Sequence, residues 1–146
     1  MAEGLMRFYL DLSDGAPDKV LRAKSVARAA GLREVDGLAS AWLAKFAFVS
    51  HVFDALVRHA RDSLDLTGAG EHSAGSRLAP AVALAHDEAE VPASVKAWYA
   101  EARRHASAEG DDATLSAIMF NMTMLRITRA RYQVLSRATG GAHACC

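Results

Sequence analysis

The sequence has few of the residues that cross-link or interrupt a small fold. It contains two cysteines, which are its last two residues, Cys145 and Cys146, and three prolines in 146 residues. A disulfide framework inside the fold is therefore excluded, and this cysteine usage is typical of a reducing compartment. We accordingly expect an intracellular, cytoplasmic protein.

Long apolar runs are also missing. A membrane span needs roughly 18 consecutive apolar residues, and the longest candidates here are interrupted by Lys45, His51, Asn121 and Arg126. The N-terminus has an acidic residue, Glu3, and no small-residue cleavage site after its short apolar stretch, so we expect no secretory signal. These features predict a soluble protein with no membrane span.

The chain has no excess of either charge, since 17 basic residues balance 17 acidic ones. This balance argues against a protein whose whole body binds nucleic acid or an anionic membrane, but it leaves room for a local basic patch. Hydrophobic residues make up 51% of the sequence, which is typical of a folded domain. At this length, one domain over residues 1–146 can bury a core without a metal or a disulfide.

Sequence motifs for catalysis are absent. There is no G-x-S-x-G nucleophile turn, no glycine-rich phosphate loop and no interior cysteine. The two adjacent carboxylate pairs, Asp87 with Glu88 and Asp111 with Asp112, fall at predicted helix ends, where capping and the helix dipole account for them. We therefore favour a non-enzymatic role and expect no cofactor.

Six histidines raise the question of a metal site. His51 and His59 are eight residues apart on a predicted helix, whereas two ligands on one helix need a spacing of three or four. The sequence also lacks the Glu-x-x-His pattern of carboxylate-bridged di-metal bundles. We therefore expect structural or surface histidines and no metal, although a pocket for a metal or a small molecule built from several helices stays open.

Apolar periodicity predicts an all-α fold, a single-domain bundle of five or six helices. Residues 1–16 form an ambiguous N-terminal segment, in which 5–12 fits either a strand or, as we favour, a helix. Residues 67–76 contain three glycines and predict a flexible loop, and we expect a disordered tail at 139–146. The remaining helices are predicted at 17–30, 35–66, 77–90, 92–109 and 112–138.

The predicted helix at 35–66 has the clearest pattern. Its apolar residues recur at steps of three and four and form one seam, which consists of Trp42, Phe46, Val49, Phe53, Leu56, Ala60 and Leu64. We expect this helix and the last one to be the two long helices of the bundle and to pack near-antiparallel.

The last helix is apolar almost all the way round between Leu115 and Ile127. A helix that turns no polar face to water must be surrounded by its own chain or by a second molecule. Ile118, Met122 and Leu125 face one way, whereas Phe120, Met124 and Ile127 face another, and one of the two sides is enough for the core of the monomer. Our leading hypothesis is therefore a protein-interaction domain, most simply a homo-oligomer, whose interface on this helix consists of Ile118, Phe120, Asn121, Met124 and Ile127.

The alternative hypothesis concerns basic residues. Arginines follow the apolar run without an acid among them, and the helix at 17–30 also has a basic outer face. If these two helices are neighbours, the arginines form one surface for nucleic acid or phosphate. The residues of this predicted surface are Arg22, Arg28, Arg126, Arg129 and Arg137.

Overall fold

The computed structural model describes residues 15–68 and 70–140, with side chains described as far as Val134. The helices of these ranges are α2 (Gly15–Ala29), α3 (Arg33–Val49), α4 (Phe53–Leu66), α5 (His72–Glu88), α6 (Pro92–Glu109) and α7 (Asp112–Gly140). No strand occurs among the described residues, so the predicted all-α class is confirmed. The predictions for residues 5–12 and for the tail beyond residue 140 lie outside the described residues.

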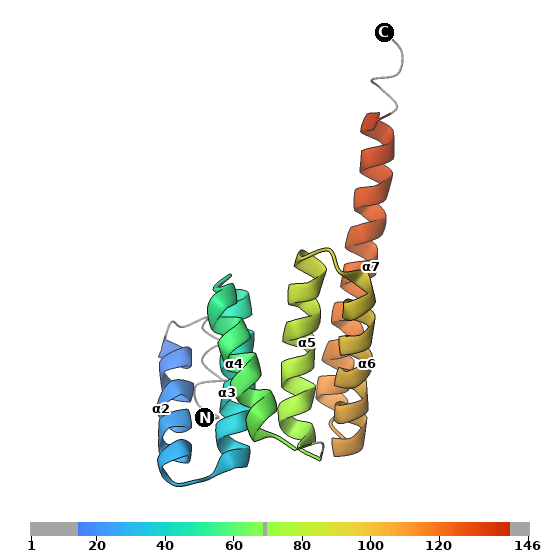
Figure 1. Cartoon of the computed structure of the whole chain (residues 1–146). Coiled ribbons are helices and arrows are strands. Elements are labelled where there is room, and N and C mark those ends of the chain that lie inside the picture. Colours follow the sequence, from blue (N-terminus) through green and yellow to red (C-terminus); the bar gives the residue numbers. More distant parts are fainter. Residues whose placement is uncertain (1–14, 69, 141–146) are drawn as a thin grey trace.

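The helices form a row in which some overlap: α2 begins it, α3 and α4 come next with α4 in front, α5 follows, and α6 stands in front of the first part of α7 at the end (Figure 1). α3 packs against α2, α4 and α5, and α6 packs against α5 and α7. Short turns connect most of the consecutive helices, so these neighbours run antiparallel. α7 lies at the end of this row, where it packs on α6 and its first turns also border a pocket shared with α3 and α5. Within the described ranges, no helix combines the length and apolar character needed to cross a membrane.

Small side chains dominate the contacts between the helices, and alanine is the commonest residue of the core. The buried residues form three clusters. The first joins α2 to α3 around Trp42 and Phe46, and the second joins α3, α4 and α5 around Leu78. The third joins α5, α6 and α7 around Tyr99 and Ile118. Because alanine adds little volume, the helices approach closely and each contact buries a modest apolar area.

The prediction of one helix over 35–66 is wrong. The chain reverses at residues 50–52 and forms a hairpin of α3 and α4. In this turn the N–H of Val52 donates to the carbonyl oxygen of Ala47 at 2.8 Å, which is the closing bond of a Schellman motif. The apolar pattern continues through the turn because both helices face the same core, so the periodicity does not reveal the reversal.

The reversal divides the predicted apolar seam. It also removes one of the two long helices that we expected to pack near-antiparallel; α7 packs on α6 instead. Of the seam residues, Trp42, Phe46, Leu56 and Ala60 are buried, whereas Val49, Phe53 and Leu64 are exposed.

The predicted loop at 67–76 is shorter than expected. α5 begins at His72 rather than Arg77, so Gly75 and Ser76 lie in its first turns. Gly75 is needed there for packing, because a Cβ atom at this position would lie 2.5 Å from the ring of His105. A glycine that we interpreted as a loop signal therefore marks a close contact between α5 and α6.

Four of the helices end in a turn of one kind. After α2, α3, α5 and α6 comes one residue with a left-handed backbone; these residues are Gly31, His51, Glu90 and Gly110, with φ of 71°, 56°, 57° and 69°. Gly31 and Gly110 end their helices as predicted, since glycine adopts this conformation without steric cost. A side chain in this region costs about 1 kcal/mol, so His51 and Glu90 introduce strain at two turns.

The strain at His51 predicts that glycine stabilises the α3–α4 turn. We expect His51→Gly to raise the free energy of unfolding by up to about 1 kcal/mol in urea titrations. Ser50→Gly is the matched control, because Ser50 has an ordinary φ of −87° and gains nothing from the added freedom. If the two variants lose stability equally, the left-handed strain at His51 is disproved.

Candidate functional site

The start of α7 is fixed by a cap and an ion pair. The backbone N–H of Thr114 donates to Oδ1 of Asp111 at 2.9 Å, and its hydroxyl donates to Oδ2 at 2.6 Å. These bonds lower the pKa of Asp111 and confirm the predicted cap. Arg77 of α5 also donates to Asp111, at 3.2 Å, so the first turn of α7 is tied to the body.

One side of α7 packs against its own chain. Leu115, Ile118, Met122 and Leu125 follow each other at steps of three and four, and all four contact the cluster around Tyr99. Beyond them, Arg129 forms an ion pair with Asp87 at the end of α5. We call the four apolar residues the inner seam; they account for the hydrophobic contacts that hold α7 on the body.

The opposite side of α7 carries a second apolar series. Its residues alternate at steps of four and three, the spacing of the a and d positions of a coiled coil. Phe120 is 64% exposed, Met124 44% and Ile127 42%. We call this series the outer seam; it consists of Ala113, Ala117, Phe120, Met124, Ile127, Arg131 and Val134, all of which are exposed.

The predicted interface residues divide between the two sides. Phe120, Met124 and Ile127 belong to the outer seam. Ile118 is 2% exposed and belongs to the inner seam, so the structure corrects its assignment: it is not available to a second molecule. Asn121 lies between the two series, on the rim of a pocket. We did not predict that Ala113, Ala117, Arg131 and Val134 extend the series, although their spacing is visible in the sequence.

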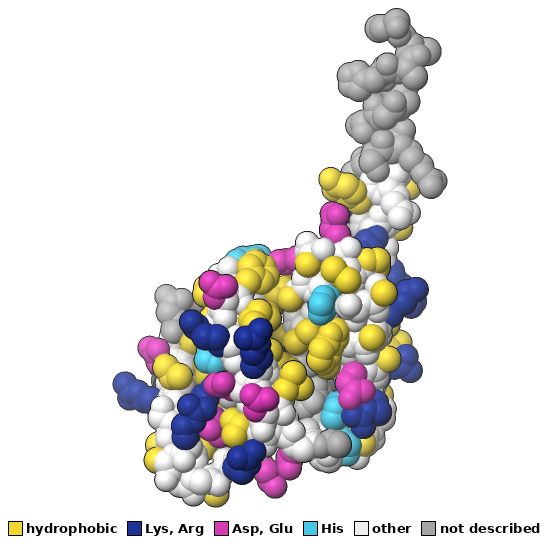
Figure 2. Space-filling model, in the orientation of Figure 1, with side chains coloured by type: hydrophobic (Ala, Val, Ile, Leu, Met, Phe, Trp, Pro, Cys, Tyr) yellow, Lys and Arg dark blue, Asp and Glu magenta, His cyan; other side chains and the backbone are white. Residues whose placement is uncertain are grey.

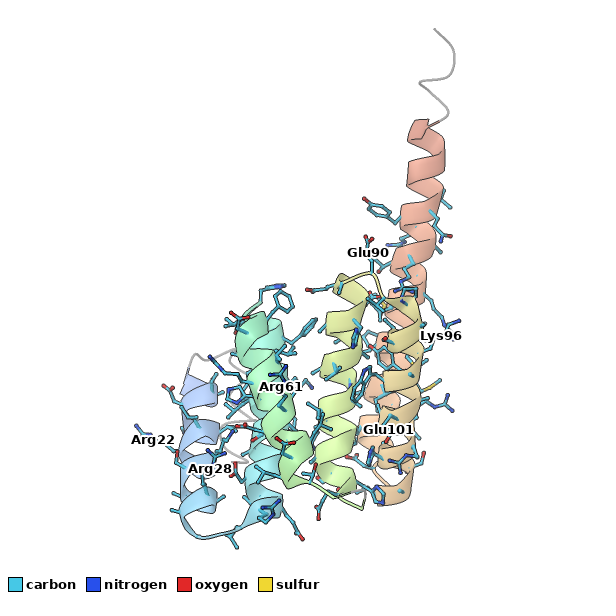
Figure 3. The ribbon with its side chains drawn as sticks, viewed as in Figure 1. Arg22, Arg28, Arg61, Glu90, Lys96 and Glu101 are labelled. Atoms are coloured by element: carbon cyan, nitrogen blue, oxygen red, sulfur yellow. The ribbon has the colours of Figure 1, made fainter. Side chains whose placement is uncertain are left out.

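The predicted basic residues do not form one surface. Arg22 and Arg28 lie on α2, at the opposite end of the row from α7 (Figures 1 and 3). Arg28 is also engaged, because its Nε donates to the buried carboxylate of Asp36 at 2.9 Å. On α7, Arg126 is exposed, and the side chain of Arg137 lies outside the described part. The condition of neighbouring basic helices is therefore not met.

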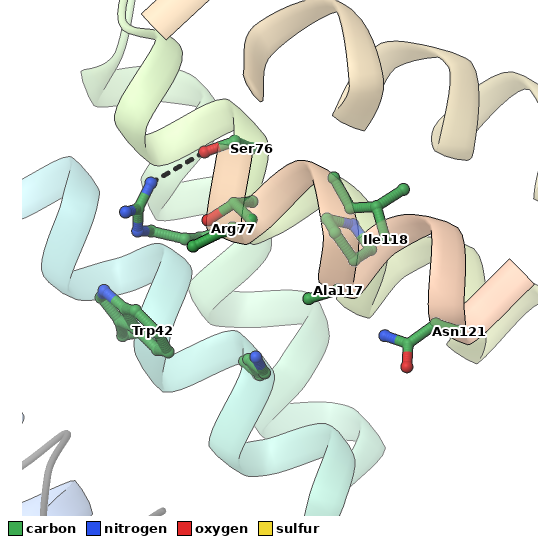
Figure 4. Close-up of a pocket in the computed structure, with 10 residues that line it drawn as sticks. Trp42, Ser76, Arg77, Ala117, Ile118 and Asn121 are labelled. Atoms are coloured by element: carbon green, nitrogen blue, oxygen red, sulfur yellow. Dashed lines mark hydrogen bonds between the residues drawn. The ribbon is translucent and has the colours of Figure 1, made fainter. Parts of the chain in front are cut away.

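A pocket of about 260 Å³ lies between α3, α5 and α7 (Figure 4). The indole ring of Trp42 lines this pocket, and two cations lie over it. Nζ of Lys45 is 5.2 Å and Cζ of Arg77 is 5.9 Å from the ring centroid. Arg77 is also bound to Glu109, Asp111 and the hydroxyl of Ser76. Since carboxylates of the protein already neutralise Arg77, we assign no anionic ligand to this pocket.

An apolar groove of about 300 Å³ lies between α4, α5 and α6. Leu56, Leu64, Val82 and Trp98 are among its lining residues. On this face of the molecule, apolar side chains gather in a hollow bordered by basic ones (Figure 2). The sequence pattern does not predict this groove, because the groove depends on the reversal between α3 and α4.

Two histidines meet where α5 and α6 approach each other. Nδ1 of His72 lies 3.0 Å from Nδ1 of His105, so one ring donates its N–H to the other. Nε2 of His105 also lies 3.1 Å from Glu101. Burial, with the nearby charge of Arg104, lowers the pKa of His105. No group of three potential metal ligands occurs in the described part of the chain.

A third histidine, His59 of α4, is half-buried near Lys24 of α2. Nδ1 of His59 has no hydrogen-bond partner among the described residues. Burial and the positive charge of Lys24 lower the pKa of His59. Lys24 itself is 5% exposed, and its Nζ donates to Asp62 at 2.5 Å. These groups hold α2 against α4 through a polar contact rather than through apolar packing.

The two lowered histidine pKa values predict that the protein loses stability in mild acid. In the unfolded chain, His59 and His105 become protonated near the ordinary histidine pKa, whereas in the folded chain they become protonated only at a lower pH. The free energy of unfolding, from urea titrations, should therefore fall from about pH 7.5 to about pH 5.5. His59→Gln and His105→Gln should each reduce this fall, whereas parent and variants should share the same dependence above about pH 7.5. A parent chain equally stable at both values would contradict this account.

No known protein family matches the chain, and no curated protein or solved structure is detectably similar to it. A function is therefore inferred from the surfaces that the described residues form.

Proposed function

We propose that this protein acts by self-association and that the outer seam of α7 is the contact surface. The observation that supports this most directly is the exposed a/d series on a helix whose opposite side is already buried. A helix with this pattern buries its apolar residues when a second helix packs along it. The series spans residues 113–134, which is about 32 Å at 1.5 Å per residue.

The composition of the outer seam suits a helix pair. Ala113 and Ala117 are small and permit a second helix to approach closely at one end. Phe120, Met124 and Ile127 supply large apolar side chains at its centre. Arg131 is a charged residue in the seam, and polar residues at such positions specify the register and the partner of a helix pair.

The test is sedimentation of the full chain over a range of concentrations. We expect the parent chain to associate by high micromolar concentration and the double variant Phe120→Ser, Met124→Ser to remain a monomer. Because both side chains are exposed, the double variant should keep the body folded and lose helical signal only from the part of α7 beyond Leu125.

Val26→Ser is the matched control for this experiment. Val26 is also exposed and apolar, but it lies on α2, far from the outer seam. The Val26→Ser variant should associate like the parent chain. A parent chain that sediments as a monomer at every concentration would overturn the proposal, and so would a double variant that associates as well as the parent.

A second candidate function is binding of nucleic acid along the C-terminal half of α7. The observation that favours it is the composition of this half, which contains the exposed Arg126 and Arg131 and no acidic residue. Fluorescence anisotropy with a labelled duplex should then show an affinity that falls steeply with salt. Replacing both arginines by alanine should weaken the binding and flatten its salt dependence, whereas Arg22→Ala, on α2, should not. Binding that is absent at low salt would exclude this function.

A further inference from the structure

The charges of α7 are segregated along its length. Asp111, which is bound to Arg77, and the exposed Asp112 lie at its start, and no acidic residue follows them to the end of the chain. Arg129, which pairs with Asp87, and the exposed Arg126 and Arg131 lie in the C-terminal half. In a parallel pair of α7 helices, the arginine-rich halves would lie side by side and repel each other. In an antiparallel pair, each arginine-rich half lies beside the acidic start of the other helix, and the two helix dipoles are also opposed.

From this segregation, and resting on the proposed self-association, we infer that two copies of the chain pair through α7 in an antiparallel orientation. The outer seam then sets the register. When Phe120 of one copy packs on Met124 of the second, Ala117 meets Ile127 and Ala113 meets Arg131.

This register places complementary groups together at each level. The ring of Phe120 meets a thioether, which is a favourable contact for sulfur. Ala117 leaves room for the branched side chain of Ile127. At each end, Ala113 leaves room for the guanidinium of Arg131, which comes within reach of Asp112. A parallel pair would instead place Arg131 against Arg131 inside the seam, where two like charges are destabilising.

The arrangement is compatible with the rest of the molecule. From Phe120 onward the outer seam lies opposite the inner seam, which packs on the body. Ala113 and Ala117 are exposed but line the pocket with Trp42, so the end of the second copy's helix lies over the mouth of this pocket. The C-terminal half of α7 runs past the ends of α5 and α6 (Figure 1). In the antiparallel pair, the first turns of the second copy's α7 cover part of this extension. The paired residues 113–131 overlap over about 28 Å.

Cysteine cross-linking distinguishes the two orientations. The natural Cys145 and Cys146 are first replaced by serine. Ala117→Cys and Ile127→Cys are then introduced in separate chains, one of which carries a tag, and the chains are oxidised alone and as a mixture. A disulfide needs Cα atoms within about 7 Å, whereas two copies of residue 117 in an antiparallel pair are about 15 Å apart along the axis.

We expect the mixture to form the disulfide-linked heterodimer and neither variant to cross-link efficiently alone. Cross-linking of each variant with itself, but not with the other, would show a parallel pair and overturn the antiparallel inference while leaving self-association intact. A chain that sediments as a monomer would instead overturn the proposed function itself. An oligomer in which no pair of these cysteines reacts would overturn the antiparallel inference and the assignment of the outer seam as the contact surface, whereas self-association itself would stand.

A charge exchange provides an independent measurement. Arg131→Asp should weaken association about tenfold, because it places an acid beside the acidic start of the second copy. Adding Asp112→Arg to the same chain should restore most of the lost affinity. Arg126→Asp is the matched control, since Arg126 lies outside the outer seam. If Arg126→Asp weakens association as much as Arg131→Asp does, the proposed register is incorrect.

Discussion

Close contact between helices lined by small side chains is the constraint on which this structure depends. Alanine is the commonest residue of the three buried clusters, and at two positions even alanine is too large. A Cβ atom at Gly37 would lie 2.4 Å from Thr67, and one at Gly75 would meet His105. Helices that approach so closely leave little space for a shared central core, so the clusters lie between neighbours in a row. A row has two ends, and among the described residues the helix at each end packs mainly against one neighbour, α2 on α3 and α7 on α6.

The sequence predicted the class of the fold and the ends of several helices, because these depend on local chemistry. Gly31 and Gly110 have left-handed backbones, and Asp111 caps α7. The hairpin of α3 and α4 was not predictable in the same way. Its turn contains His51 in a conformation that favours glycine, so the local preference and the actual structure disagree. Gly75 led to the opposite error. It predicts a loop, but it lies in α5, where the close contact with His105 requires a residue without a side chain.

Apolar character alone predicted that α7 must be surrounded, but it did not divide the residues correctly between the two sides. Ile118 belongs to the core, and the series opposite to it extends further than the predicted interface, to Ala113 and Val134. Alanine and arginine do not stand out in a search for large apolar residues, although both occupy heptad positions here. The predicted joint basic surface of α2 and α7 is wrong for another reason. Whether two helices are neighbours depends on the tertiary arrangement, which no local pattern encodes.

The extension of α7 beyond the body also has an energetic consequence. A helical segment in water gains little from its backbone hydrogen bonds alone, and most helices in proteins are stabilised by packing of an apolar face. The inner seam supplies that packing only as far as Leu125, near the end of the body. Beyond this point the apolar residues that remain, among them Ile127 and Val134, face outward. A partner helix along the outer seam would supply the missing packing, so association and the stability of the extended helix are expected to be thermodynamically coupled.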